Sequence, residues 1–260
     1  MAKGLILETA EAGVLTVTIN RPEKLNALTP AMHRALHEAF DRFSADDALQ
    51  VCVVKGAGER AFCAGSDLSG FKADDASPYP PSGYAGLAQR HDLAKPVIAM
   101  VDGLCLGGGF ELALACDMIM ASERAVFGLP EPKVGLIAIG GGVHRLVRQA
   151  GLKQAMGPLL TGRNMSAAEG LRMGFVSEVH PAGDLEDAVA ATCAAILANA
   201  PLAVRLSKEL ALWGLDQPSL ADALARQADH PSYIRWRQSE DAAEGPRAFA
   251  EKRKPEWKGR

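Results

Sequence analysis

The sequence predicts an α/β domain followed by a mainly helical region. Up to about residue 150, short apolar strands alternate with helical segments, a pattern typical of α/β domains. After Gly151 the pattern becomes mostly helical, with one short strand expected at Val176–Val179. The chain has 260 residues, 48% of them hydrophobic, so it is long enough for one large domain or for a domain with a small appendage.

The first strands and the first helix are indicated by alternating side chains and by a capping pattern. Leu5–Asn20 is predicted to form two short strands around the turn Glu11-Ala12-Gly13, and apolar and polar residues alternate in Leu15–Ile19. Thr29-Pro30 supplies an N-cap and a first-turn proline for a helix that runs to about Ser44. The apolar run Val51–Gly56 then predicts a buried strand.

The middle of the chain contains a polar segment, another buried strand and a second glycine run. Residues 70–86 are rich in Gly, Pro, Ser and Asp, which predicts a mobile surface loop. We expect a buried strand at Val97–Val101, strand and loop over Ser122–Val134, and a helix from Gly140-Gly141-Gly142 through Arg148. Further helices are expected at 153–160, 166–173, 184–199, 201–213 and 218–229.

Charge and cysteine content narrow the class of protein. The net charge of −3 argues against a general binder of nucleic acid or membrane surfaces. The five cysteines form no CxxC pair and the N-terminus lacks a signal-peptide layout, so we expect a reduced, cytoplasmic protein. The apolar stretch Pro96–Ala121 carries charged residues and four glycines, which indicates a core segment rather than a membrane span.

Two glutamates twenty positions apart stand in settings that disfavour an idle carboxylate. Glu111 follows Gly107-Gly108-Gly109 in an otherwise apolar helical segment, and Glu131 lies between two prolines. An unpaired carboxylate in apolar surroundings is costly, so it usually protonates, finds a partner or serves a bound substrate. Two such groups converging on one pocket would allow a proton to enter and another to leave.

Glycine-rich turns are candidates for binding an oxygen. Each glycine of the run Gly107-Gly108-Gly109 costs about 1 kcal/mol relative to alanine in a helix. N–H groups at a helix start can point at a bound oxygen, although tight helix–strand packing would also explain the run. The turn Ala64-Gly65-Ser66 could present another N–H, and two donors from separate loops would form an oxyanion hole for a thioester or ester carbonyl.

Other motifs have simpler interpretations. Gly56–Ala61 imitates a dinucleotide fingerprint, but no helix is expected after it. His33 and His37 lie at i, i+4 without a third ligand, so a solvated helix face is favoured over a metal site. Ser66 lacks the G-x-S-x-G setting of a hydrolase nucleophile, and His144 is better explained by packing or surface exposure than by catalysis.

The C-terminal tail carries five basic residues in the nine positions Lys252–Arg260. A solvated, frayed terminus is one interpretation. The other is a small anion site beside Phe249 and Trp257, which would suit a phosphate-bearing nucleotide.

Taken together, these segments resemble the crotonase superfamily, whose members include the enoyl-CoA hydratases. The matching segments are Asn20–Leu28, Ala64–Leu68, Gly107–Ala113, Pro130–Leu136, Ser239–Ala242 and Phe249–Arg253. The resemblance implies a spiral of ββα units with a C-terminal helical region that builds trimers, often paired into hexamers. Residues 1–195 would be the core with the CoA and catalytic site, and residues 196–260 would serve oligomerisation and CoA contact.

The resemblance also implies site residues. The oxyanion donors would be the N–H groups of Ser66 and Gly108, and the two hydratase acids would be Glu111 and Glu131. The CoA groove would be lined by Lys24, Ala64, Asp67 and Leu68, with Phe249 and Lys252 near its adenine end. This chain departs from the family pattern at Ser66, where relatives carry alanine or a large aromatic residue, and at Ala138-Ile139, which replaces the usual Pro-Gly.

The implied activity is that of an enoyl-CoA hydratase, which adds water syn across the 2,3 double bond reversibly and needs neither a metal nor a redox cofactor. The segments Gly109–Ala115 and Glu244–Arg253 look closest to carnitinyl-CoA dehydratases, so that activity is an alternative. An aromatic content of 5% gives little material for a trimethylammonium cage, so it is the runner-up. A Δ3-Δ2 isomerase, which often keeps only the second acid, and a non-catalytic acyl-CoA scaffold are further alternatives.

Overall fold

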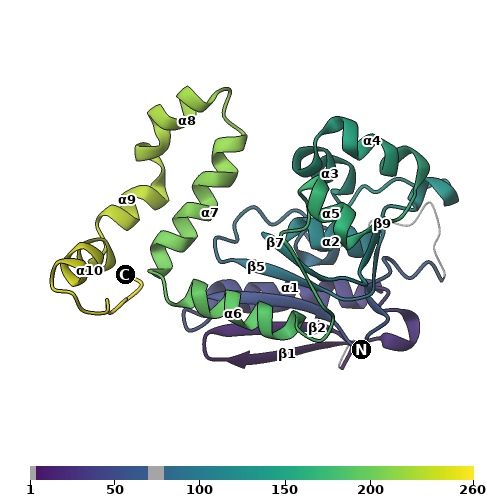
Figure 1. Ribbon diagram of the computed structural model, residues 1–260, viewed down its shortest axis with the longest axis horizontal. Helices are drawn as coiled ribbons and strands as arrows, with labels where there is room; N and C mark the ends of the chain where they lie inside the picture. The colour runs from purple at the N-terminus through teal and green to yellow at the C-terminus, as the bar shows by residue number, and fades with distance from the viewer. Residues whose placement is uncertain (1–3, 70–78) are drawn as a thin grey trace. The chain divides into compact units, whose positions relative to one another are not determined.

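The computed structural model of the chain describes residues 4–69 and 79–260, which form two compact units (Figure 1). One unit comprises Met1–Asp92 and Val97–Ala191, and it contains both β-sheets. The other comprises Leu93–Pro96 and Thr192–Arg260 and is helical. Helix α6 (Leu185–Leu197) begins in the first unit and ends in the second.

The larger sheet has six strands in the order β1-β2-β3-β5-β7-β10. Its strands are β1 (Ile6–Glu11), β2 (Val14–Ile19), β3 (Val51–Gly56), β5 (Val97–Val101), β7 (Met118–Ser122) and β10 (Glu178–His180). The pair β1–β2 is antiparallel, and all other neighbours are parallel. Strand β5 is buried throughout, as expected for a parallel strand covered on both faces. The strands predicted before residue 102 are confirmed, whereas the last strand begins two residues later than predicted.

The second sheet has four short strands in the order β4-β6-β8-β9. They are β4 (Ala61–Cys63), β6 (Leu104–Leu106), β8 (Val126–Gly128) and β9 (Met165–Ser166). From β3 to β8, successive strands along the chain belong alternately to the two sheets. As a result, β3, β5 and β7 are neighbours in one sheet, and β4, β6 and β8 are neighbours in the other. This repetition places the loops that follow β4, β6 and β8 at one region of the unit, where the site lies.

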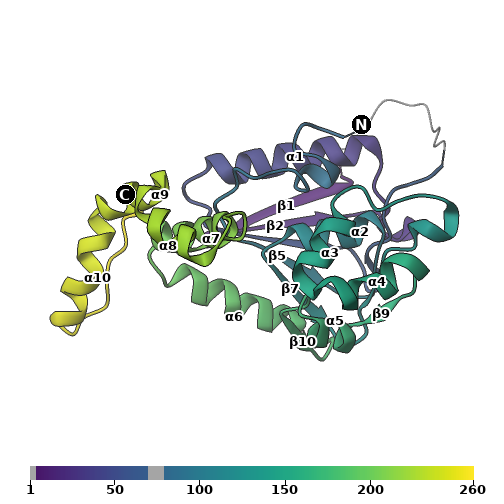
Figure 2. The same cartoon turned by 90° about the horizontal axis from the view of Figure 1, so that it is seen from above.

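Helices of the first unit follow the predicted pattern. They are α1 (Pro30–Ala45), α2 (Gly108–Ala115), α3 (Gly142–Ala150), α4 (Leu152–Thr161) and α5 (Ala167–Met173), with short 3₁₀ helices η1 (Pro22–Lys24), η2 (Tyr84–Gly86) and η3 (Glu131–Val134). Helix α1 begins as predicted, because the side chain of Thr29 accepts the N–H of Met32. It lies alongside β1 and β2 (Figure 2).

The prediction of a surface loop at 70–86 is wrong for its second half; residues 70–78 lie outside the described part of the chain. Residues 82–88 are buried against α1. Gly86 has a φ of 69°, and a Cβ there would lie 2.4 Å from the backbone nitrogen of His37, so only glycine permits this approach. The apolar side chains of Tyr84, Ala85 and Leu87 outweigh the glycines and serine that suggested solvent exposure.

The expectation of a solvated face at His33 and His37 is also wrong. His33 is 2% exposed, and its Nδ1 accepts the N–H of Ala85 at 3.0 Å. His37 Nδ1 is 2.8 Å from the hydroxyl of Ser82 and 2.9 Å from the guanidinium of Arg90. The two imidazoles therefore fasten the 82–90 segment onto α1, because they lie one helical turn apart on the same face.

The helical unit contains two helices that the sequence analysis did not predict. Its elements are α7 (Pro201–Leu215), α8 (Leu220–Arg226), η4 (Gln227–Asp229), α9 (Pro231–Arg237) and α10 (Glu240–Ala250), of which α9 and α10 were missed. Among the described residues no single helix is both long and apolar enough to cross a membrane. Only α6 and α7 together, bent by 105° at the break between them, meet those limits of length and composition.

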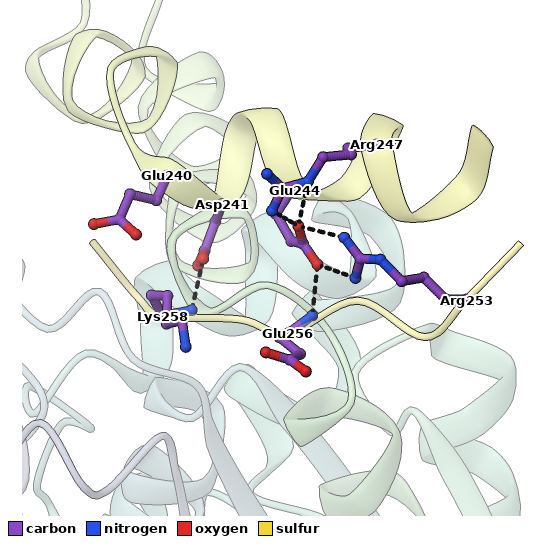
Figure 3. A pocket seen from close by; sticks show the side chains of 7 residues that line it. All are labelled: Glu240, Asp241, Glu244, Arg247, Arg253, Glu256 and Lys258. Carbon is purple, nitrogen blue, oxygen red and sulfur yellow. Dashed lines mark hydrogen bonds and ion pairs between the residues drawn. The ribbon is translucent and has the colours of Figure 1, made fainter. Parts of the chain in front are cut away.

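The C-terminal tail folds back along α10 and is held by two buried carboxylates (Figure 3). Asp241 accepts the N–H groups of Lys258 at 2.7 Å and Gly259 at 2.9 Å. Glu244 accepts the N–H of Glu256 at 2.9 Å. It also forms ion pairs with the guanidinium groups of two arginines, Arg247 and Arg253. We call Asp241, Glu244, Arg247 and Arg253 the tail clamp. A frayed terminus is thus the wrong interpretation, because buried acids bind the tail's backbone.

Candidate active site

Two glycines at the start of α2 leave room for the close approach of two functional side chains. Gly107 has a φ of 53°, and a Cβ there would lie 2.8 Å from Oε1 of Glu131. A Cβ at Gly108 would lie 2.1 Å from the hydroxyl oxygen of Tyr84. Real Cβ atoms do not approach other atoms so closely, so these two glycines let a carboxylate and a phenol reach the helix start.

The third glycine serves packing. A Cβ on Gly109 would lie 2.1 Å from the backbone carbonyl oxygen of Cys63, at the end of β4. The packing interpretation of the run is therefore confirmed at Gly109, whereas Gly107 and Gly108 give room to side chains. The binding of an oxygen by the N–H groups of the run remains a prediction. Cys63 itself is fully buried, and burial raises the pKa of its thiol to about 12, so it stays protonated.

The two predicted donor turns adjoin one another. Gly65 has a φ of 102°, and a Cβ there would lie 3.2 Å from the backbone nitrogen of Gly108. Leu28 bridges the residues on either side of Ser66, because its N–H donates to Gly65 at 2.8 Å and its carbonyl accepts from Asp67 at 2.8 Å. Within the described residues, the N–H groups of Ser66 and Gly108 have no acceptor. Two backbone donors thus remain free in neighbouring turns.

Glu111 is 3% exposed and lies against the second glycine run. Its Oε1 accepts the N–H of Gly142 at 2.9 Å, and a Cβ on Gly140 would lie 2.6 Å from its Oε2. Burial, aided by the charge of Glu131, raises the pKa of Glu111 to about 7 against the lowering effects of the hydrogen bond from Gly142 and the charge of Arg145. Glu111 therefore changes protonation state close to neutral pH.

Glu131, in the first turn of η3, is the less constrained acid. Its Oε2 is buried and has no hydrogen-bond partner among the described residues. Burial raises the pKa of this carboxyl above its usual range. A buried carboxylate oxygen without a partner is costly, which fits a group that meets its partner only when a ligand is bound. Because its charge affects the pKa of Glu111, the two predicted acids share one site.

Tyr84 is a site residue that the sequence analysis missed. It is 3% exposed, and its hydroxyl lies 3.1 Å from Oγ of Ser66. Its ring meets those of His33 and Tyr79 edge-on, with centroids 4.6 Å and 5.3 Å away. The signal that could have found it is the apolar stretch Tyr84–Ala88, which stands out inside an otherwise polar segment.

The residues predicted to line a CoA groove are placed as follows. Lys24 is exposed at the end of η1, and Leu68 is 51% exposed. The N–H of Ala64 donates to Leu25 at 3.0 Å. Hydrogen bonds from Ser69 and Arg21 hold the pKa of Asp67 well below its usual range, so this carboxylate is engaged within the protein. Phe249, which is 87% exposed, and Lys252 belong to the helical unit. Their contact with CoA remains a prediction.

An acid pair with raised pKa values beside two free backbone N–H groups equips an enzyme to move protons next to a carbonyl whose oxygen gains negative charge. Among the described residues, no three His, Cys, Asp or Glu side chains converge as ligands of a metal ion.

Comparison with known proteins gives the family. Residues 9–260 match the enoyl-CoA hydratase/isomerase family. The chain is 43% identical to a carnitinyl-CoA dehydratase of Proteus mirabilis over 256 residues, 97% of each chain. Among solved structures it resembles an enoyl-CoA hydratase of Mycobacterium marinum, with a TM-score of 0.91 and 40% identity over 99% of this chain and 100% of the other. It also resembles an enoyl-CoA hydratase of Bacillus anthracis, with a TM-score of 0.92 and 33% identity over 98% and 100%.

The chain therefore belongs to the enoyl-CoA hydratase/isomerase family and has the crotonase fold. It is an enzyme of the hydro-lyase type that acts on CoA thioesters.

Proposed function

We propose that this enzyme adds water reversibly to the 2,3 double bond of an enoyl-CoA. The observation that carries the proposal is the pair Glu111 and Glu131, whose pKa values are both raised and of which the second acts on the pKa of the first through its charge. A non-catalytic scaffold would gain nothing from two costly carboxyl groups in one apolar site.

The proposed mechanism assigns a separate task to each group. Glu111, with a pKa near 7, takes a proton from water as the water oxygen bonds to C3. Glu131, whose Oε2 has no partner among the described residues, gives a proton to C2. The thioester oxygen gains negative charge between these events, and the N–H groups of Ser66 and Gly108 stabilise it, each by about 3 kcal/mol.

A second candidate is the dehydration of carnitinyl-CoA. The relatives at 43% and 41% identity bear that name and are matched over 97% of their length. The chemistry is the same reaction run in reverse on a substrate with a trimethylammonium group. The pair of acids would serve both reactions, so the acyl group alone separates the candidates.

The test is turnover of crotonyl-CoA, crotonobetainyl-CoA and a 3-enoyl-CoA in ¹⁸O-labelled water, followed by mass spectrometry. Label in the product of crotonyl-CoA, with the higher kcat/KM, supports the main proposal. A higher kcat/KM for crotonobetainyl-CoA would replace it with the second candidate. Conversion of the 3-enoyl-CoA without label would identify an isomerase instead.

We also propose that the chain assembles as a homotrimer or homohexamer through its helical unit. Exposed apolar side chains on that unit support the proposal, among them Leu212, Leu215, Leu220 and Leu224. Native mass spectrometry distinguishes the monomer, the trimer and the hexamer directly.

A further inference from the structure

The phenol of Tyr84 touches both turns that carry the proposed oxyanion donors. The three atoms nearest to the missing side chain of Gly108 all belong to Tyr84, with Oη and Cζ each 2.1 Å from the ideal Cβ position. On the other side, Oη lies 3.1 Å from Oγ of Ser66. The hydroxyl therefore lies near both residues whose N–H groups have no acceptor in the described part of the chain.

The other end of Tyr84 lies next to the first acid. Its Cβ is 3.0 Å from the ideal Cβ position of Gly140, the residue that borders Oε2 of Glu111. The side chain thus extends from Gly140, which borders Glu111, to Ser66 and Gly108 in the two proposed oxyanion turns. The Cβ and the hydroxyl of Tyr84 therefore both lie next to proposed catalytic groups.

The ring is held in this position from behind. His33 Nδ1 accepts the N–H of Ala85, the next residue, and Ala85 has a left-handed φ of 52°. Burial lowers the pKa of His33 to about 4, so the imidazole is neutral at pH 7 and its lone pair stays available as an acceptor. A strained residue kept in place by a buried acceptor is a feature of positions where precise geometry matters.

The hydroxyl groups around Ser66 leave one proton uncommitted. Ser66 Oγ lies 3.1 Å from the hydroxyl of Tyr84, at hydrogen-bonding distance. Each hydroxyl has one proton to donate, so two hydroxyls joined by one hydrogen bond have one O–H to spare. When Ser66 donates to Tyr84, the spare proton belongs to Tyr84. A hydroxyl that accepts a hydrogen bond is also a stronger donor.

We propose that the Tyr84 hydroxyl is a third hydrogen-bond donor to the thioester oxygen, beside the N–H groups of Ser66 and Gly108. This rests on the proposed function, because it is the thioester oxygen that gains charge as water attacks C3. A donor that strengthens as charge develops lowers the barrier more than it tightens substrate binding. Tyr84 would therefore act mainly on kcat.

The experiment compares Tyr84→Phe, which removes only the oxygen, with Tyr79→Phe as the matched control on the neighbouring ring. Tyr84→Phe should lower kcat for crotonyl-CoA hydration by about 10- to 100-fold, with a smaller change in KM, since deleting one oxyanion donor has an effect of about that size or larger. Tyr79→Phe should reduce kcat less, because the Ser66–Tyr84 pair survives. Ser66→Ala should also reduce kcat less than Tyr84→Phe.

A second measurement does not depend on turnover. A cinnamoyl-CoA thioester absorbs at longer wavelength when hydrogen bonds polarise its carbonyl, so the spectrum of the bound ligand reports the donors directly. Tyr84→Phe should diminish the red shift seen with the wild-type enzyme, and Tyr79→Phe should diminish it less. An undiminished shift in Tyr84→Phe, or equal losses in both variants, would overturn the inference while leaving hydration intact. A wild-type enzyme that hydrates no enoyl-CoA would refute the proposed function, and the spectrum alone would then decide the role of Tyr84.

Discussion

Two buried glutamates of the described chain, Glu111 and Glu244, differ in what surrounds them. Glu111 in the candidate site and Glu244 in the tail clamp are 3% and 5% exposed. Burial raises the pKa of Glu111 to about 7, whereas hydrogen bonds from Arg253 and the Glu256 N–H hold the pKa of Glu244 well below its usual range. Burial alone thus does not decide the pKa of a carboxylate, because its hydrogen-bond and ion-pair partners can outweigh it.

The partners differ in number and in charge. Glu244 has two guanidinium groups and a backbone N–H, so its charge is compensated within the protein. Glu131 has a buried oxygen without a partner among the described residues, and Glu111 accepts backbone N–H groups rather than an ion pair. Glu244, whose charge is compensated, fastens the tail, whereas the unpartnered oxygen of Glu131 can still accept a hydrogen bond from a substrate.

The largest expected effect is loss of activity on neutralising the acids of the site. Glu111→Gln and Glu131→Gln should each lower hydration at least ~100-fold, the scale of general acid–base groups. The double variant should be little slower than either single one, since the two act as a unit. Steady-state kinetics and thermal melting test this, with the exposed Glu59→Gln as control. Near-normal turnover by either variant would remove that residue from the mechanism.

The same substitution in the tail clamp should affect stability rather than chemistry. Glu244→Gln removes the charge that two arginines share, so the helical unit should melt several degrees lower and the tail should become accessible to protease. Glu240→Gln on the same helix is the matched control, because that side chain is exposed. The comparison fails if both variants melt alike.

The two acids should also give opposite dependences of stability on pH. The folded state holds the proton of Glu111 up to about pH 7, whereas an unfolded glutamate releases it near 4.3, so this residue's contribution to stability falls as pH rises between those values. The contribution of Glu244 is present above its unfolded pKa and is lost as pH falls below it. Melting curves of Glu111→Gln should lack the first decline, and kcat/KM of the wild type should rise through pH 7.

The smallest expected effect separates binding from folding within the basic tail. Arg253 and Arg260 pair with Glu244 and Glu240, whereas within the described part of the chain no carboxylate pairs with Lys252. Lys252→Ala should therefore raise KM for an acyl-CoA more than for a pantetheine thioester without the nucleotide, at an unchanged melting temperature. Arg253→Ala should lower the melting temperature instead. Equal KM changes on both substrates would show that Lys252 does not contact the nucleotide.

The sequence predicted the elements whose signals are local. Period-two alternation predicted β2, and Thr29-Pro30 predicted the start of α1. The strands β4 and β6 were missed, because three residues are too few to show a period. Helices α9 and α10 were missed because their buried faces carry few apolar side chains; α10 buries Asp241 and Glu244 instead.

At the site, the limit was long-range contact. Glu111 and Glu131 were predicted from their apolar surroundings, which are visible along the chain. Tyr84 lies in a segment whose glycines and serine suggested a surface loop, and its burial depends on α1, some fifty residues earlier. A pattern in a short stretch of sequence does not report contacts with a distant stretch, so the burial of Tyr84 became visible only in the three-dimensional structure.

The glycine run at Gly107–Gly109 constrains how this enzyme can evolve or be engineered. Gly109 faces the backbone carbonyl of Cys63, which no substitution removes, and Gly107 has a left-handed φ that disfavours other residues. At Gly108, by contrast, the three nearest atoms all belong to the side chain of Tyr84, which a substitution can shorten. To reshape the pocket at this helix, Tyr84 must therefore be replaced by a shorter residue before Gly108 is replaced by a larger one. In the reverse order, the new side chain at position 108 collides with Tyr84.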